Sequence, residues 1–83
     1  MLELARHLLE PIVTHRDALQ IRAVEGDAAI ILEAIVHADD RDMLEQDGGR
    51  TLRAIRTVLS AAAGREKATL DLVEAFDAEG GEE

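Results

Sequence analysis

Two strand-like segments on either side of a glycine turn constrain the fold of this chain more than any other feature. In the first segment, Leu19, Ile21 and Ala23 alternate with residues that would face the opposite side. The turn Glu25-Gly26-Asp27 follows, and the second segment, residues 28–36, is apolar and rich in β-branched side chains. This pattern predicts a β-hairpin.

The second segment would carry apolar side chains on both faces of the hairpin. Ile31 and Ile35 would lie on the outer face with Glu33, which leaves two isoleucines exposed. Single apolar residues are common on protein surfaces, whereas a larger apolar patch marks a dimer or partner interface. Both interpretations of this isoleucine pair stay open. The core face would take every second residue: Ile30, Leu32, Ala34 and Val36.

One helix is expected before the hairpin and one strand near the end of the chain. Apolar residues recur at helical spacing over residues 2–14. Pro11 should loosen the last turn of this helix, because it has no N–H to donate to the carbonyl of His7. Residues 67–75 alternate between apolar and other side chains and predict a third strand.

Two helices separated by a tight turn are expected between the hairpin and the third strand. The aspartates at residues 39–40 can cap a short helix that reaches Leu44 or Gln46, since carboxylates are favoured at a helix N-terminus. A tight turn follows at residues 47–49, and a longer helix covers residues 50–63. The apolar stripe of that helix consists of Leu52, Ile55, Val58, Leu59 and Ala62.

The order of these elements, α-β-β-α-α-β, predicts an α+β fold. Three helices would cover one face of a three-stranded sheet. The 83 residues suffice for one domain, which we expect to span residues 1–75. Residues 76–83 form an acidic tail without apolar periodicity, for which disorder is expected.

Composition indicates the setting in which such a domain would work. The chain has no cysteine, which excludes disulfides and thiol chemistry and suits a reducing cytosol. Its longest apolar run, residues 28–32, is far shorter than the roughly 20 residues of a membrane-spanning helix, so we expect a cytoplasmic protein outside membranes. The net charge of −9 opposes binding to phosphate groups. Residues 50–67 nevertheless form a basic island, in which Glu66 is the single acidic residue and the basic residues are Arg50, Arg53, Arg56, Arg65 and Lys67.

No pattern of side chains indicates an active site, a metal site or a cofactor. His7, His15 and His37 are far apart and have no second ligand at helical spacing, so each is expected to be an ordinary surface histidine. The acidic stretch over residues 39–47 lacks the alternating ligands and the terminal glutamate of a calcium loop. The hydroxyl residues of the longer helix have no histidine–carboxylate partner that would activate them. We therefore expect a protein that is not an enzyme.

Two segments resemble a known family. Gly49 to Ala63 reads GRTLRAIRTVLSAAA, and the hairpin reads VEGDAAIILEAIV. The chain is thereby similar to the small bacterial KH-domain RNA-binding proteins of the KhpA type, whose helix has the form GRTxxAIRTxxSAAA and whose hairpin has the same V-E-G turn. The similarity runs without gaps from about Leu4 to Val73. It implies the type II KH fold, which has the element order given above, and binding of single-stranded RNA.

The resemblance also implies where RNA would bind. In KH domains a G-x-x-G loop between two helices clamps the backbone of about four nucleotides, and bare backbone amides approach the phosphates. This loop falls on residues 46–49, where Gly49 is the second glycine and Gln46 replaces the first. Asp47 stands where the family has a basic residue, and Glu45 replaces an isoleucine of the binding groove. The loop is therefore altered, while the scaffold is retained.

Two functions stay open on this evidence. The first is RNA binding, weakened or relaxed by the altered loop, in which glycine amides and three arginines on one side of the helix contact phosphates. The second is a protein-interaction or dimerisation module that has lost RNA binding and forms a homodimer or pairs with a second KH-containing protein. The candidate RNA site comprises Gln46, Asp47, Gly48, Gly49, Arg50, Arg53 and Arg56, and the candidate partner surface comprises Ile31 and Ile35.

Overall fold

The fold alternates helices and strands in an order close to the expected one. The computed structural model describes residues 1–76, so the acidic tail from residue 77 onward lies outside the described residues. The elements are α1 (Leu2–Leu9), the 3₁₀ turn η1 (Arg16–Ala18), β1 (Gln20–Glu25), β2 (Ala29–Ile35), α2 (Ala38–Ala63) and β3 (Lys67–Leu72). None of the helices formed by residues 1–76 has the length and apolar character needed to cross a membrane.

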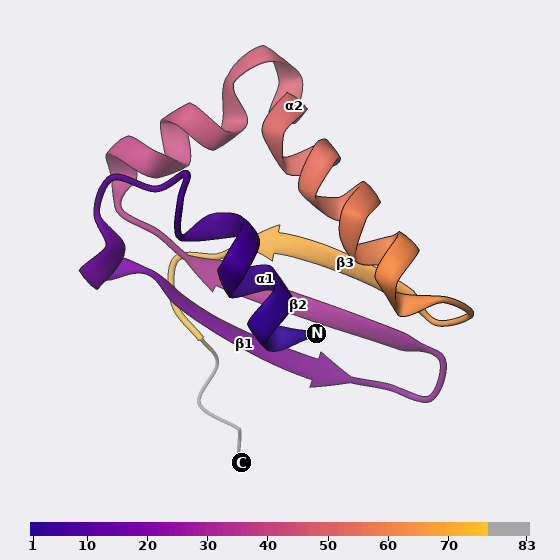
Figure 1. The fold of residues 1–83 in the computed structure, drawn as a ribbon. Coiled ribbons are helices and arrows are strands. Elements are labelled where there is room, and N and C mark those ends of the chain that lie inside the picture. The colour runs from indigo at the N-terminus through magenta and orange to yellow at the C-terminus, as the bar shows by residue number, and fades with distance from the viewer. Residues whose placement is uncertain (77–83) are drawn as a thin grey trace.

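The sheet has three strands in the order β1-β2-β3. The antiparallel pair β1–β2 sets Ile21 opposite Ala34, which confirms the expected hairpin. The pair β2–β3 is parallel and sets Leu32 opposite Leu70. Parallel neighbours need a long crossover, and α2 supplies it. Figure 1 shows α1 and α2 together on one side of the sheet, with α2 arching over it.

The hydrophobic core lies between that side of the sheet and the two helices. The alternation of β2 is as expected at Ile30, Leu32 and Ala34, which are buried, and at Ile31, which is 38% exposed. Ile35, expected to be exposed, is half-buried instead. Since the side chains of a strand alternate between its faces, one register buries the whole inner set. The other strands and helices complete the same cluster: Ala5, Leu9, Val13, Leu19, Ile21, Leu44, Leu52, Ile55, Leu59, Ala68 and Leu70.

The first helix is shorter than the sequence indicated. It ends at Leu9 instead of continuing to residue 14. Pro11 is the physical reason, because it provides no N–H for the carbonyl of His7. Two bonds to the Leu9 carbonyl, from Ile12 N–H and Val13 N–H at 3.0 Å each, close a final turn after the helix.

Two helices, α1 and α2, stand where three were expected, because the two helical segments expected after β2 are joined across a kink in α2. α2 covers both, with an interruption of non-helical backbone at residues 46–49. Its expected apolar stripe also needs correction, since Val58 is 45% exposed and Ala62 is exposed as well. β3 stops at Leu72 instead of residue 75, and its last bond to β2 runs from Val73 N–H to the Ala34 carbonyl at 2.9 Å.

The outer face of the sheet carries both charged and apolar side chains. Arg22 Nε donates to Glu33 Oε1 at 2.7 Å across the β1–β2 pair. The Phe76 ring lies beneath the Arg22 guanidinium, with 4.8 Å between the Arg22 Cζ atom and the ring centroid. Val24 and Ile31 are exposed opposite one another on the same face. Phe76, assigned to the tail from the sequence, therefore lies against the domain.

Candidate functional site

The interruption of α2 forms a left-handed turn, which we call the 46–49 turn. Gln46 is extended, with φ −60° and ψ 152°, and the next residues have φ values of 55°, 67° and 80° at Asp47, Gly48 and Gly49. Glycine adopts this region without steric cost, and aspartate is among the few other residues that tolerate it. The turn redirects α2 at the top of the molecule (Figure 1).

Two buried leucines fix the helical segments on either side of this turn. Leu44 is fully buried in the N-terminal part of α2, residues 38–45, and Leu52 is buried in the C-terminal part, residues 50–63. Both belong to the main core. The residues between them are exposed or half-exposed, so the core holds the ends of the turn and leaves its backbone at the surface.

Arg53 orients one peptide plane of the turn. Its Nη1 atom donates a hydrogen bond to the carbonyl oxygen of Gly48. Since the carbonyl and the N–H of a trans peptide point in opposite directions, the N–H of Gly49 is directed away from Arg53. The space where a Gly49 side chain would project is empty for 4 Å. The backbone at Gly49 is therefore approachable from outside.

Arg50 is the free cation of this region. It is exposed, and its side chain makes no hydrogen bond or ion pair with any of residues 1–76. It directly follows Gly49 at the start of the C-terminal part of α2. An unpaired guanidinium at this position can reach an anion on the turn without breaking an existing contact.

Arg56 has a structural position that the sequence did not indicate. Its Nε atom donates to the carbonyl of Leu70 at 2.8 Å, and its Nη2 atom lies 3.9 Å from Asp71 Oδ1. Ser60 Oγ donates to the carbonyl of Ala68 at 3.2 Å. Neighbouring residues of a strand direct their backbone groups to opposite edges. Lys67 bonds on the β2 side, so the carbonyls of Ala68 and Leu70 point to the open edge of β3. Arg56 and Ser60 therefore cap the edge strand.

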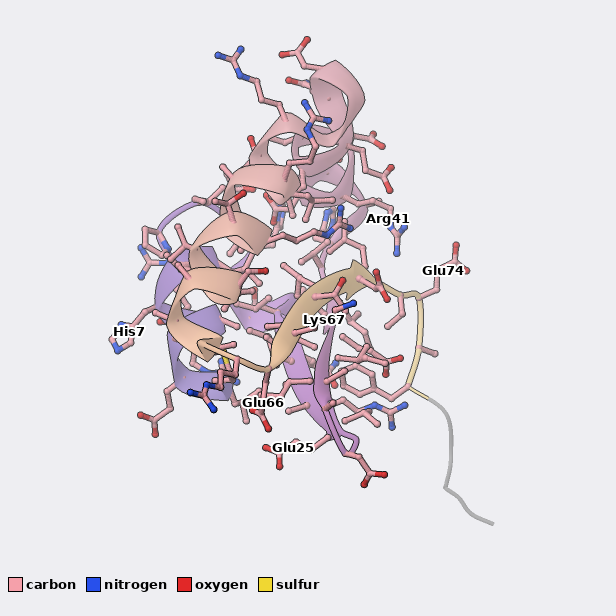
Figure 2. All side chains as sticks on the ribbon, turned by 90° about the vertical axis from the view of Figure 1, so that its right-hand side faces the viewer. His7, Glu25, Arg41, Glu66, Lys67 and Glu74 are labelled. Carbon is pink, nitrogen blue, oxygen red and sulfur yellow. The ribbon has the colours of Figure 1, made fainter. Side chains whose placement is uncertain are left out.

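The charges around the turn have mixed signs. Glu45 pairs with Arg41, with 3.5 Å between Oε2 and Nη1. Asp47 has no ion-pair partner in the described part of the chain. Figure 2 shows Arg41 extending on the same side of the molecule as Glu74. An incoming phosphate would therefore meet one unpaired carboxylate at Asp47 and one unpaired guanidinium at Arg50.

The opposite end of the N-terminal part of α2 is anchored by a buried carboxylate. Asp40 is 2% exposed and receives hydrogen bonds from the connector after α1: from Thr14 N–H at 2.8 Å, Thr14 Oγ1 at 2.9 Å and His15 N–H at 3.0 Å. Burial raises the pKa of this carboxyl, but these hydrogen bonds favour the charged form more strongly and lower the pKa to about 2. Asp40 therefore stays ionised.

The helix cap is a further correction to the expectation from sequence. The N-cap of α2 is His37, whose Nδ1 atom accepts a hydrogen bond from Asp39 N–H at 3.1 Å. Asp40 was expected to cap this helix, and instead it binds the connector. His15, expected to be an ordinary surface histidine, stacks on His37. Long-range contacts of this kind leave no local periodicity that a sequence pattern could report.

The structure brings together most of the candidate RNA site but not all of it. Gln46, Asp47, Gly48 and Gly49 form the turn, with Arg50 beside it and Arg53 against Gly48. Arg56 reaches β3 instead, where its guanidinium binds the Leu70 carbonyl. No enclosed cavity exists within residues 1–76, so the site is an open surface.

Comparison with known proteins identifies several relatives. RNA-binding protein KhpA of Streptomyces coelicolor is 40% identical over 63 residues, covering 76% of this chain and 80% of that protein. RNA-binding protein KhpA of Bacillus subtilis is 37% identical over 60 residues, covering 72% and 74%. RNA-binding protein KhpA of Caldanaerobacter subterraneus is 34% identical over 65 residues, covering 78% and 87%. No family model matches the chain, and no solved structure matches it.

Proposed function

This chain belongs to the KhpA family of bacterial proteins, and from that premise we propose that it binds single-stranded RNA on the 46–49 turn. The observation that carries the proposal is the left-handed backbone at Asp47, Gly48 and Gly49 between two anchored helical segments. A KH domain holds the RNA backbone at this kind of turn. The curated relatives are named as RNA-binding proteins, which supports this function.

Two groups would contact the RNA backbone. The Gly49 N–H points away from the Arg53 side chain, and no atom lies within 4 Å of the place where a Gly49 side chain would project, so we propose that a phosphate oxygen approaches the backbone there. Arg50 supplies the unpaired positive charge next to it. We propose that Arg53 supports the turn from beneath, and that Arg56 stabilises β3 instead of contacting RNA.

The expected affinity is low at high salt. Asp47 places a carboxylate in the turn, and the chain carries a net charge of −9. Both repel phosphate, while attraction by cations such as Arg50 declines as salt rises. Binding should therefore be strongest in low salt and weaken steeply on adding salt.

A charge reversal at Arg50 tests this proposal. Fluorescence anisotropy with a short labelled single-stranded RNA, at low salt, should show saturable binding that Arg50→Glu weakens about tenfold. Arg65→Glu is the matched control, because Arg65 is also exposed but lies in the turn between α2 and β3. No saturable binding by the parent protein, or equal losses in the two variants, would contradict the proposal.

We also propose that the outer face of the sheet mediates self-association. Ile31 and Val24 are exposed there and Ile35 is half-buried, which provides apolar surface on one side of β1 and β2. Sedimentation equilibrium should show a dimer that Ile31→Lys dissociates. If Val58→Lys dissociates the dimer instead, the interface lies on α2. If the chain pairs only with a second KH-containing protein and not with itself, the outer face of the sheet is a surface for that partner.

We place the protein in the cytoplasm as a binding protein and not as an enzyme. RNA is the partner that its family indicates, and cellular RNA is cytoplasmic in bacteria. The relatives carry names of binding proteins, which supports this assignment. Fractionation of cells that produce the chain tests this location.

A further inference from the structure

Three side chains with metal-binding atoms converge where the connector after α1 meets the start of α2. His15 comes from the connector, His37 is the N-cap of α2, and Asp39 lies in its first turn. The two imidazole rings stack with 3.7 Å between centroids and an angle of 8° between planes. Each of the three residues offers one ligand atom, and these atoms all lie within 4.8 Å of one another.

The hydrogen bonds of His15 select the tautomer that a metal ion needs. Thr14 Oγ1 donates its one hydrogen to Asp40 Oδ1 at 2.9 Å. Thr14 Oγ1 therefore has only lone pairs left for His15 Nδ1, which lies 2.9 Å away and must carry the proton. The lone pair of His15 is then on Nε2. Asp40 Oδ2, 3.4 Å from Nδ1, adds the carboxylate that commonly supports a metal-binding histidine.

His37 and Asp39 already interact at the other side of the ring stack. Asp39 N–H donates to His37 Nδ1 at 3.1 Å, and Asp39 Oδ2 lies 3.7 Å from the same nitrogen. A ligand lone pair lies in the plane of its imidazole ring, so two parallel rings must rotate apart to point at one ion. His37 must also release Nδ1, the nitrogen that carries its lone pair, from Asp39 N–H. The side chains are exposed enough for this rotation, at 39% for His15 and 43% for His37.

We propose that His15, His37 and Asp39 bind a divalent transition-metal ion such as Zn²⁺. Two imidazoles and a carboxylate suit zinc, copper or nickel, whereas calcium and magnesium require a set of oxygen ligands. Three protein ligands leave at least one coordination position for water. The overall negative charge of the chain favours accumulation of cations at its surface. The bound ion would join the connector to the start of α2.

Calorimetric titration of Zn²⁺ into the tag-free full chain at neutral pH tests this site. The parent protein should bind one ion per chain, and His37→Asn should weaken binding about tenfold or more. Asparagine is a good N-cap residue, so this variant removes the imidazole and keeps the helix cap. His7→Asn is the matched control, because His7 projects from α1 into solvent (Figure 2) and should leave Zn²⁺ affinity unchanged.

Thermal unfolding gives a second measurement on the same proteins. Saturating Zn²⁺ should raise the Tm of the parent and of His7→Asn but not that of His37→Asn, because an ion bound only to the folded state stabilises it. Absence of saturable Zn²⁺ binding, equal affinity in the parent and His37→Asn, or equally tight binding of Mg²⁺ would overturn the proposal. Arg50→Glu should bind Zn²⁺ like the parent, which separates this site from the RNA site.

Discussion

The two ends of the N-terminal part of α2 are built in opposite ways. At residues 37–40, side chains bind inward: His37 caps the helix, and Asp40 holds Thr14 and His15. At residues 46–49, the backbone takes left-handed angles, and the Arg53 guanidinium contacts the Gly48 carbonyl. The polar groups of the first end bind within the fold, whereas the backbone of the second end stays at the surface, where we propose that RNA binds.

This difference explains how α2 can both stabilise the fold and carry an exposed turn. A recognition turn needs exposed amides, and exposed amides cannot stabilise the segment that carries them. Stability must then come from elsewhere in the same segment, here from buried Leu44 and from the carboxylate of Asp40. Substitutions at the anchored end should therefore change stability, and substitutions at the turn should change RNA affinity.

The largest expected effect is at Leu44, which lies between the two ends. Leu44→Ala should lower the free energy of unfolding by about 3 kcal/mol, because the side chain is fully buried and its removal leaves a cavity. Urea denaturation followed by circular dichroism measures this loss. Val58→Ala, on the exposed side of α2, should change it by less than about 0.5 kcal/mol. Similar losses would show that the N-terminal part is not anchored by its core residue.

Asp40→Asn should destabilise the anchored end, with a smaller effect. Asparagine replaces one carboxylate oxygen by an NH₂ group that cannot accept the bonds from the connector. Because folding lowers the pKa of Asp40 from 3.8 to about 2, its ionised form contributes stability above pH 3.8 that is lost as pH falls through 2. Tm measured against pH in the presence of a chelator should fall less steeply over this interval in Asp40→Asn. Asp42→Asn, an exposed neighbour, should behave like the parent.

At the turn, removal of negative charge should strengthen RNA binding. Asp47→Asn keeps a residue that tolerates left-handed angles and should raise affinity about fivefold, since one repulsive charge near a phosphate is lost. Gln46→Gly combined with Asp47→Lys should raise it about tenfold or more. Anisotropy titrations measure both, with Asp42→Asn as the control of equal charge change. An unchanged affinity would place RNA away from the turn.

The smallest effect separates the two arginines beside the turn. Arg50→Gln should weaken RNA binding and flatten the dependence of log K on log salt by about 0.7, because one phosphate contact is lost. Arg53→Gln should weaken binding about threefold with little change in that slope, because it positions the Gly48–Gly49 peptide. Faster amide exchange at Gly49 in free Arg53→Gln would support this role. Equal changes in slope would instead make both arginines phosphate contacts.

Most of the fold follows from local periodicity. The hairpin, the inner face of β2 and the third strand were predicted, because alternation in sequence reports directly which side of a strand is buried. The end of α1 was missed, although Pro11 marked the turn at which the helix fails. The exposure of Val58 was missed because sequence periodicity indicates which side of a helix is apolar but not how much of that side is covered. The packing of α2 against β3 decides which of these residues are buried.

The turn of the candidate site was predictable in position, but the contacts of the side chains around it were not. The family motif located the turn at residues 46–49, and the glycines there have the left-handed angles that such a turn requires. Arg53 and Arg56 were assigned to RNA from the family resemblance and their helical spacing, and neither can show that each side chain donates to a backbone carbonyl. The stacking of His15 on His37 joins residues far apart in sequence, so only tertiary structure reveals it.

The capped edge of β3 limits how this domain can assemble. An unprotected edge strand invites a strand from another molecule to continue the sheet, and that reaction leads to fibrous aggregates. Here the guanidinium of Arg56 and the hydroxyl of Ser60 occupy the carbonyls that an added strand would need. Addition of a strand at that edge is therefore disfavoured as long as these two side chains hold the carbonyls of Leu70 and Ala68.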